Sequence, residues 1–512
     1  MRRRGQEVFS VRAHAWGGRG LLISGLALAA ACSAGSSDGA SHGARDGSVS
    51  DATGDGASVV DASNDAGDDG AAPDAAQDAA TDTGDAALPA CEAPVLGRGR
   101  AWVRENPMMI SGLAVVMPAP SAAEVGEYFD GFGATAVHLW ETGLPAELTG
   151  FAAAGHPAFR YISWVDRDGS SRANGSLLGG AAPLPGRIGY QIGDEPADAA
   201  DLDAMMAGAA AVASADPDGL RIINLNDSSG ANALRAQAIE AANIDVLSYD
   251  HYSYKTSAQN GLMATRTAAL AAGKPYFRYM RSFFYKDDGP SGTPSDVRWD
   301  ALVGAVYGFT GYTWFVYSIE AASADLAPLL FSVGGDYSAP KTALYAAAAS
   351  ANRELAELGK SLALLESTDV RYVTSTPILA PASLATFSPG AGGDRYLSGV
   401  ALGGGADALI GIFRDDCGER YVMVQNQAHA NGIGPNRSAN TQRFTLSFDF
   451  SSSADPTLDR RSVLALDPSS GVIARRPLTA TGAATARLEL DLEAGALLFF
   501  KYANARPFVR QP

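Results

Sequence analysis

The sequence predicts an α/β protein in which a (β/α)8 TIM barrel is followed by an antiparallel β-sandwich. From about residue 107 short apolar runs alternate with amphipathic stretches, and after residue 365 the pattern changes to alternation within short segments. An Asp-rich stretch without aromatic residues precedes both patterns. We therefore expect four regions: an export leader over 1–32, a disordered tether over 33–90, the catalytic barrel over 91–365 and the sandwich over 366–512.

Eight β-like runs define the predicted barrel. They cover 109–117, 134–140, 158–165, 187–193, 220–226, 244–250, 275–280 and 311–317, with helical patterns among them at 121–129, 201–213, 232–242, 260–272, 297–307 and 340–358. Eight parallel strands with following helices in about 250 residues are typical of this barrel. A doubly wound open sheet would carry a Gly-rich dinucleotide loop after its first strand, and the sequence has none there.

Short alternating segments after residue 365 predict the sandwich. They cover 369–374, 408–414, 420–426, 443–450, 463–467, 486–492 and 496–502, and turn residues separate them. The turn at 415–418 predicts a hairpin between two of these strands. Such a domain either braces the barrel or binds glycan, and the lack of an aromatic strip in its sequence favours bracing.

The N-terminus predicts export with a lipid anchor. Arg2, Arg3 and Arg4 begin a basic segment, residues 21–31 carry no charge, and this run ends in Ala-Ala-Cys32. Such a run is too short to span a bilayer, which needs about 20 residues, but it has the layout of a secretory signal. The ending resembles a bacterial lipobox, which implies lipidation of Cys32, and Ser33 after it resembles the sorting signal for the outer membrane. An ordinary signal peptide with an incidental Cys is the alternative.

The segment 33–90 explains most of the acidity of the chain. It holds twelve Asp and one Arg, whereas the whole chain has a net charge of −17 and residues 91–512 have a net charge of −10. A segment of this composition buries too little apolar surface to offset the entropy of ordering, so we expect a solvated tether. With no basic patch interleaved with aromatic residues, the composition argues against nucleic acid as a partner.

We expect Cys32→Ser to move the protein from the membrane fraction to the soluble exported fraction, because the lipid would have no attachment site. Cell fractionation followed by immunoblotting measures this change. Unchanged partitioning of the variant would contradict lipidation of Cys32.

Two further cysteines, Cys91 and Cys417, are either a disulfide pair in an oxidising compartment or two free thiols. No CxxC or Cys/His spacing indicates a metal site, and the sequence predicts no cofactor.

Polar and aromatic residues gather at the predicted C-terminal ends of the barrel strands, where barrels of this class carry their chemistry. Strand four ends in Asp194-Glu195-Pro196, and strand six ends in Asp250. Over about 107–365 the chain resembles the clan of (β/α)8-barrel glycoside hydrolases that includes the family 42 β-galactosidases. That clan carries its acid/base Glu at the end of strand four, usually as Asn-Glu-Pro. The resemblance therefore implies Glu195 as the acid.

Strand seven departs from the clan, because Arg278, Tyr279 and Arg281 stand where the retaining relatives carry a nucleophilic Glu. Retaining enzymes need two carboxyl groups about 5 Å apart and inverting ones about 6.5–9.5 Å apart. Two partners for Glu195 stay open. Asp250 could act as base or nucleophile, or Asp194 could orient an N-acetyl group of the substrate, as in substrate-assisted hexosaminidases. A helix cap or support for Glu195 is the structural alternative for Asp194.

Sugar rings stack on aromatic faces, and sugar hydroxyls need fixed polar partners. Candidate substrate-binding residues at the strand ends are Trp140, Glu141, Trp164, Asn226, His251, Tyr252, Arg278, Trp314 and Tyr317. A core role is the alternative for Trp314, and His138, on an apolar strand, fits a buried barrel histidine.

Together these features predict hydrolysis of O-glycosidic bonds in an extracellular or periplasmic oligosaccharide, with Glu195 as general acid. The alternative is a surface lipoprotein that binds glycan on a barrel without catalysis. The missing carboxylate on strand seven is the main argument for that alternative.

Overall fold

We analysed a computed structural model of the chain. It describes residues 91–114, 119–139, 146–166, 185–226, 234–235, 237–238, 241, 243–250, 252, 258–285, 292–318, 326–331, 339–374 and 380–512. Residues 89–512 form one compact unit. Cys32 and the expected tether lie outside the described residues.

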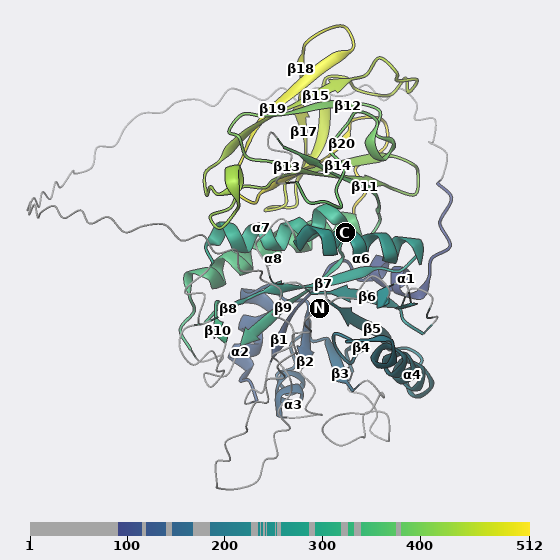
Figure 1. Cartoon of the computed structure of the whole chain (residues 1–512), viewed down its shortest axis with the longest axis vertical. Coiled ribbons are helices and arrows are strands. Elements are labelled where there is room, and N and C mark those ends of the chain that lie inside the picture. Colours follow the sequence, from purple (N-terminus) through teal and green to yellow (C-terminus); the bar gives the residue numbers. More distant parts are fainter. Residues whose placement is uncertain are drawn as a thin grey trace, which may run out of the picture. The chain divides into compact units, whose positions relative to one another are not determined.

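Eight parallel strands close into a barrel, as the sequence predicts (Figure 1). They are β1 (Met109–Ala114), β2 (Ala136–Leu139), β3 (Tyr161–Val165), β4 (Arg187–Ile192), β5 (Leu220–Leu225), β6 (Val246–Tyr249), β7 (Tyr276–Arg281) and β9 (Gly311–Ser318). The barrel closes through the pairing of β9 with β1. All eight predicted runs are confirmed as strands, with most ends shifted by a few residues.

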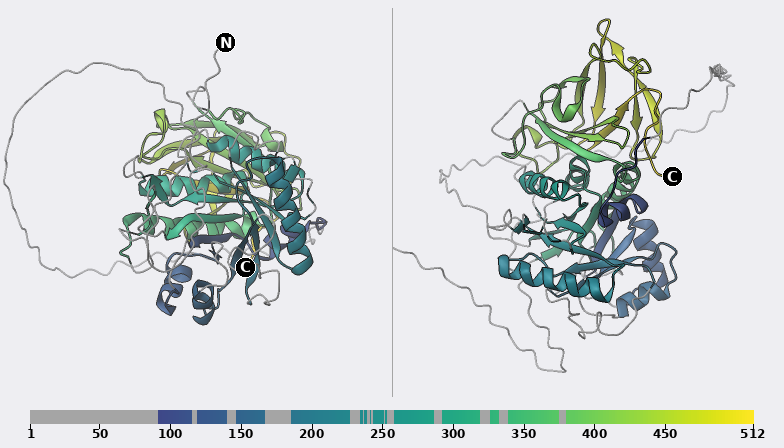
Figure 2. Two further views of the ribbon diagram at one scale, coloured as in Figure 1. Left: turned by 60° about the horizontal axis from the view of Figure 1, so that its bottom comes forward. Right: turned by 90° about the vertical axis from the view of Figure 1, so that its right-hand side faces the viewer.

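Helices cover the outer faces of the strands (Figure 2). They are α1 (Arg98–Glu105), α2 (Ala122–Gly126), continued by a π-helical turn at Glu127–Gly131, α3 (Ala146–Ala153), α4 (Ala199–Ala215), α6 (Ala258–Ala271), α7 (Pro294–Tyr307) and α8 (Ala343–Leu362). Local chemistry fixes the ends of α7. A capping box between Thr293 and Asp296 begins the helix, with Pro294 at its first position, and Gly308 ends it at φ +90°.

Strand alternation divides the barrel residues between interior and exterior. Near the N-terminal ends of the strands an interior apolar layer contains Met109, Ile162, Val246 and Phe277, among others. Val103 of α1 packs in the same layer, so α1 closes this end of the barrel. The polar residues described below lie at the opposite end, where the C-termini of all eight strands meet.

A two-stranded antiparallel ribbon follows the barrel rim and was not predicted. It pairs β8 (Phe283–Tyr285) with β10 (Leu326–Pro328). Its strands have only three residues each, which is too short for a periodic pattern to be recognisable in the sequence.

The C-terminal region is a β-sandwich of two antiparallel sheets, as predicted. One sheet contains β11 (Glu366–Val373), β13 (Ala408–Arg414), β14 (Arg420–Asn426), β16 (Ser462–Leu466), β17 (Ile473–Pro477) and β20 (Leu497–Tyr502), and the other contains β12 (Leu397–Leu402), β15 (Gln442–Asp449), β18 (Thr479–Ala480) and β19 (Thr485–Leu492). Their facing side chains form one core. The predicted hairpin joins β13 to β14, whereas β12, β17 and β18 were not predicted.

The outer face of the six-stranded sheet is buried against the barrel helices. Phe413, Tyr421 and Phe499 of this sheet belong to the same hydrophobic cluster as residues of α7 and α8. At the contact, Trp299 of α7 stacks on His429 at 4.3 Å, and His429 Nδ1 lies 2.8 Å from Asp296 Oδ1. A face buried in this way cannot bind glycan, so the contacts agree with a bracing role for this sheet.

A disulfide joins Cys91, just before α1, to Cys417 in the β13–β14 turn. It closes a loop with a sequence separation of 326 residues. Of the two alternatives left open by the sequence, the structure has the pair.

We expect Cys417→Ser to lower the free energy of unfolding by about 2–5 kcal/mol, because the cross-link restricts the unfolded chain. Denaturant unfolding under non-reducing conditions measures this loss. Cys91→Ser should cost the same, and the double variant should cost no more than either single one. If a reducing agent leaves the unfolding of the wild type unchanged, the disulfide contributes nothing and the prediction is wrong.

Within the described ranges, we find no helix that combines the length and the apolar character needed to cross a membrane.

Candidate active site

Three carboxylates meet at the C-terminal end of the barrel. Asp194 and Glu195 follow β4, and Asp250 follows β6. Because all eight strands are parallel, these ends lie at one mouth of the barrel. Asp194 and Glu195 are partly exposed, whereas Asp250 is buried and hydrogen-bonds Glu195. The structure thus brings together the three residues that the sequence proposed as catalytic.

Glu195 is held in an unusual backbone conformation. Its φ is +36°, in the left-handed region that residues other than Gly rarely adopt. The chain turns there because Gly193, also at positive φ, ends β4, and the Glu195 N–H donates to the Asn224 carbonyl at 3.2 Å. Strain of this kind costs about 1–3 kcal/mol and is concentrated at functional sites. The observed conformation therefore supports a functional role for Glu195.

Asp194 is fixed by two amide side chains from inside the barrel. Asn224 Nδ2 donates to Asp194 Oδ1 at 2.9 Å, and Gln191 Nε2 donates to the same oxygen at 3.3 Å. Gln191 Oε1 in turn accepts the hydroxyl proton of Tyr279 at 2.5 Å. The oxygen of Tyr279 lies 3.3 Å from His138 Nδ1. A hydrogen-bonded chain from β2 through β7 and β4 therefore ends on Asp194.

His138, at the far end of this chain, is neutral. Burial lowers its pKa to about 3, so it stays uncharged at every pH at which the protein is expected to work. Because the Tyr279 hydroxyl donates to Gln191, the proton between His138 and Tyr279 must lie on Nδ1. His138 is thus a buried barrel histidine, as its apolar strand indicates, and it orients Tyr279.

The surroundings of Asp250 favour its protonated form. Burial raises its pKa well above the ordinary value of a carboxyl group, and the charge of Glu195 and the hydrogen bond with it raise it further. Tyr252 also hydrogen-bonds Asp250 and acts in the opposite direction. Glu195 and Asp250 therefore form a hydrogen-bonded carboxyl pair in which a proton on Asp250 is favoured.

This raised pKa predicts a pH-dependent stability difference between the wild type and Asp250→Asn. A carboxyl group with a folded pKa above its unfolded value of about 3.9 binds more protons in the folded state, so stability is lost as the pH rises through that window. Asn does not titrate. The melting temperature of Asp250→Asn, relative to that of the wild type, should therefore increase as the pH rises above about 4. Thermal denaturation between pH 3 and 8 measures this gain, and a difference independent of pH would contradict it.

Aromatic side chains surround the carboxylates in the upper interior of the barrel. Trp164 lies 6.0 Å, between ring centroids, from His138, and it belongs to a cluster with Tyr279 and Phe283. Tyr252 stacks on Phe315 at 5.4 Å. Trp164 and Tyr252 are thus beside the carboxylates, where the sequence placed substrate-binding residues. Asn226, at the end of β5, is partly exposed.

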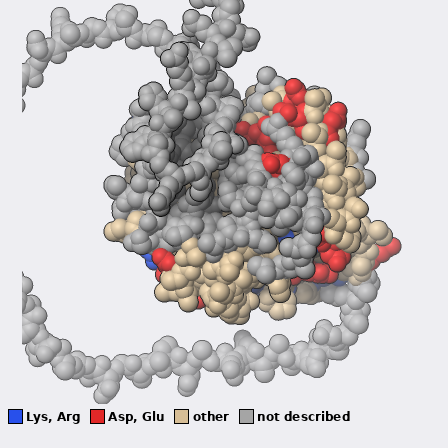
Figure 3. Space-filling view, turned by 90° about the horizontal axis from the view of Figure 1, so that it is seen from below, with Lys and Arg blue, Asp and Glu red and all other residues tan. Residues whose placement is uncertain are grey.

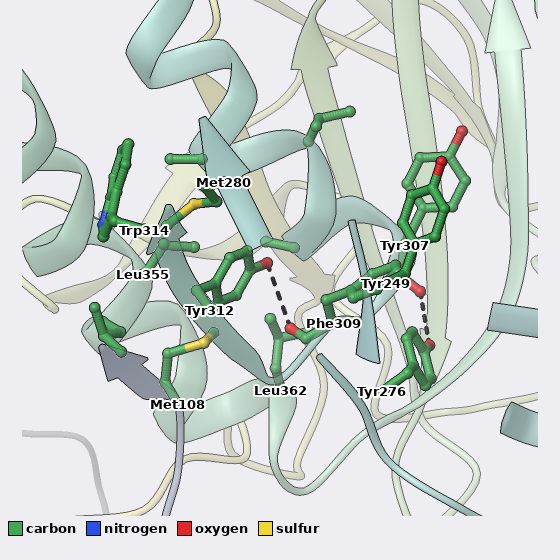
Figure 4. Packing of buried hydrophobic residues seen from close by; sticks show 14 of the residues in the cluster. Met108, Tyr249, Tyr276, Met280, Tyr307, Phe309, Tyr312, Trp314, Leu355 and Leu362 are labelled. Atoms are coloured by element: carbon green, nitrogen blue, oxygen red, sulfur yellow. Dashed lines mark hydrogen bonds between the residues drawn. The ribbon is translucent and has the colours of Figure 1, made fainter. Parts of the chain in front are cut away.

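Three predicted substrate-binding residues lie elsewhere. Arg278, Trp314 and Tyr317 lie on the outer face of the barrel wall. Arg278 is on the opposite face of β7 from Phe277. Trp314 and Tyr317 both belong to the outer cluster, since the pairing of β9 with β1 is irregular between them. Trp314 packs near Met280 and Leu355 (Figure 4) and donates to Asn352 Oδ1 at 2.8 Å. All three are almost completely buried between strands and helices. Their assignment to the substrate site is therefore corrected to a core role.

Arg278 and Tyr317 have defined partners in this outer layer. Arg278 Nη2 donates to Asp300 Oδ1 of α7 at 2.5 Å, and Tyr317 packs against Tyr128 and Phe132. Trp140, Glu141 and His251, the remaining predicted residues, lie outside the described residues.

Gln191, Asn224 and Tyr279 lie at the site but were not among the site residues predicted from the sequence. Their signal is positional: Tyr279 is two residues after the interior Phe277, and Asn224 is two residues after the interior Ile222. Counting in steps of two from the interior apolar layer would have found Asn224 and Tyr279, because strand side chains alternate between the faces of the barrel wall, but not Gln191, which is three residues after Ile188 of that layer.

Among the residues that the structure describes, no set of three or more His, Cys, Asp or Glu side chains is arranged to hold a metal ion.

Comparisons with known proteins give structural neighbours only. No family model and no curated protein matches the chain. A glycoside hydrolase family 5 protein from Bacteroides vulgatus has 11% identity and a TM-score of 0.48, with 79% of this chain and 91% of that chain covered. An endo-β-1,4-mannanase from Thermotoga petrophila has 11% identity and a TM-score of 0.34, with 75% and 91% covered. α-Galactosidase I from Mortierella vinacea has 9% identity and a TM-score of 0.38, with 76% and 92% covered. Likeness at this level carries no conclusion about activity.

Proposed function

We propose that this protein hydrolyses O-glycosidic bonds of an oligosaccharide, with Glu195 as general acid. The observation that carries the proposal is the carboxyl pair of Glu195 and Asp250 at the active end of a barrel, where burial and the charge of Glu195 raise the pKa of Asp250 well above its ordinary value and so favour a proton on that residue. General acid catalysis needs such a proton, delivered to the leaving-group oxygen as the glycosidic bond breaks.

In this proposal the two members of the pair have different tasks. A direct hydrogen bond brings the carboxyl groups closer than the roughly 5 Å of a retaining pair or the roughly 6.5–9.5 Å of an inverting pair. Asp250 therefore serves best as the buried group that stores the proton and passes it to the partly exposed Glu195. The second catalytic carboxylate is then Asp194, which Asn224 and Gln191 hold in a fixed orientation.

The compartment and the anchor are part of the same proposal. The basic leader, the Ala-Ala-Cys32 ending and Ser33 support an exported lipoprotein of the outer membrane. Its substrate would then be an extracellular or periplasmic oligosaccharide, bound by Trp164 and Tyr252 inside the mouth and by Asn226 at its rim.

A screen of aryl glycosides, including N-acetylhexosaminides, tests the proposal. We expect release of the aryl group from at least one glycoside, and loss of this activity in Glu195→Gln on unactivated substrates. Asp194→Asn then separates the mechanisms. A large loss confined to N-acetylated substrates indicates assistance by the acetamido group, whereas a loss on all substrates indicates Asp194 as base or nucleophile.

The second candidate is a barrel that binds glycan without cleaving it. One observation favours it: Tyr279 lies on the interior face of β7 beside the site, in the stretch where retaining relatives carry a carboxylate. Binding of an oligosaccharide by calorimetry, without product in the presence of either the wild type or Glu195→Gln, would favour this candidate over the hydrolase.

A further inference from the structure

A basic cavity lies away from the barrel mouth, between α6 and the six-stranded sheet of the sandwich. Its volume is about 490 Å³, within the range of small-molecule sites. Arg266, Arg414 and Arg420 line it together with one acidic side chain, Glu366, which gives the lining a net charge of +2. Residues 91–512 as a whole have a net charge of −10, and acidic side chains are prominent on the described part of the face in Figure 3. The positive charge of this cavity is therefore local.

Two of these arginines face each other across neighbouring strands. Arg414 of β13 is the direct register partner of Arg420 of β14. Like charges in this position repel each other and destabilise the sheet. Burial and the charge of Arg414 both lower the pKa of Arg420, whereas the charges of Asp394 and Glu366 raise it and compensate part of the positive charge.

The arginines differ in how their donors are used. Arg266 donates to the hydroxyl and the carbonyl of Ser367 at 2.8 and 2.9 Å, and Arg414 donates to Glu366 Oε2 at 2.8 Å. By contrast, Arg420 Nη1 is buried and has no hydrogen-bond partner among the described residues. Nη1 is closed off by protein atoms, so a ligand cannot reach it; Nε and Nη2 of Arg420 are not closed off in this way, and they too have no hydrogen-bond partner among the described residues.

The backbone leaves room for this guanidinium. Gly393 has φ +76°, and a Cβ atom built on it would lie 2.7 Å from Arg420 Nη2. Any other residue at this position would therefore make the end of the Arg420 side chain shift, and it would also be strained at this φ.

We infer that this cavity binds an oxyanion, held chiefly by Arg420 and Arg414. Carboxylate, sulfate and phosphate share the required chemistry, because each presents paired oxygens to a planar guanidinium fork. A bound anion would lie between two positive charges that otherwise repel, and it would accept from the accessible Nε and Nη2 donors of Arg420. The site is made by other residues than the carboxylates of the barrel mouth, so the inference does not rest on the proposed function.

Calorimetric titration of the full chain with glucuronate, sulfate and phosphate, at an ionic strength fixed with sodium chloride, tests the inference. We expect at least one of the three to bind and to raise the melting temperature by about 2 °C near saturation. The anion that binds most tightly identifies the source as an acidic sugar, a sulfate ester or a phosphate compound.

Variants locate the binding. Arg420→Gln should weaken the affinity about tenfold or more, while its melting temperature without anion stays at or above that of the wild type, because repulsion with Arg414 is removed. Arg420→Lys keeps the charge but loses the fork and should bind more weakly than the wild type. The control Arg443→Gln, on the other sheet and paired with Asp491, should bind normally. Absence of binding by all three anions, or equal affinity in Arg420→Gln and the wild type, would overturn the inference.

Discussion

Glu195→Gln is expected to lower kcat for an unactivated glycoside by about 10²–10⁴-fold, the usual contribution of general acid catalysis. Gln keeps the shape of Glu195 and can still hydrogen-bond Asp250, but it has no proton to transfer. Aryl glycosides with a good leaving group should lose much less activity, because their departure needs little protonation. The ratio of the two losses is the diagnostic quantity, since simple misfolding would lower both equally.

Steady-state kinetics on a matched pair of activated and unactivated substrates measures this ratio. The control is Glu489→Gln on β19, a partly exposed residue in the sandwich that should leave kcat unchanged. Folding of Glu195→Gln should be intact, because Glu195 is partly exposed and not in the core. If the variant cleaves the unactivated substrate at the wild-type rate, Glu195 is not the general acid.

Arg278→Met is expected to lower the free energy of unfolding by about 3–5 kcal/mol while leaving the kinetics of folded molecules unchanged. Arg278 and Asp300 form a buried ion pair between β7 and α7, with side chains 4% and 5% exposed. Removal of one partner leaves the other charge buried and uncompensated, and this is the origin of the large cost. A residue in the substrate site would instead change KM with little effect on folding.

The double variant Arg278→Met/Asp300→Asn makes the test sharper. Asp300 Oδ2 also accepts the Arg281 N–H at 3.1 Å, and the Asn oxygen can keep this bond while the charge is removed. More than half of the stability lost in Arg278→Met should therefore return. Arg443→Met breaks the exposed pair with Asp491 and should cost only about 0–1 kcal/mol. A tenfold rise in KM of Arg278→Met with unchanged denaturant unfolding would show that Arg278 belongs to the substrate site and not to the core.

The hydrophobic pattern of the sequence was sufficient to predict the order of the barrel strands and of most sandwich strands. The eight apolar runs correspond to the eight barrel strands, and the alternating segments after residue 365 correspond to strands of the sandwich. This agreement arises because hydrophobic periodicity and turn residues are properties of residues that are close in sequence. The strands that were missed, β8, β10 and β18, are short enough that no period can be read from them. β12 and β17 are longer, but no run in the sequence was assigned to them.

The same distinction applies to the candidate site, part of which could be predicted from the local sequence and part of which could not. The sequence by itself determined that Asp194, Glu195 and Asp250 end strands of a parallel barrel, and parallel strands bring their ends to one mouth. It could not determine which way each side chain points. Arg278 and Trp314 are as polar or aromatic, and as near a strand end, as Tyr279 and Trp164, but only the latter two face inward. That choice depends on the register of each strand in the closed barrel, where a shift of one residue exchanges the interior face for the helix-covered face. The pKa of Asp250 was likewise decided by the tertiary structure, because burial and contact with Glu195 arise only when β4 and β6 are brought into the same barrel.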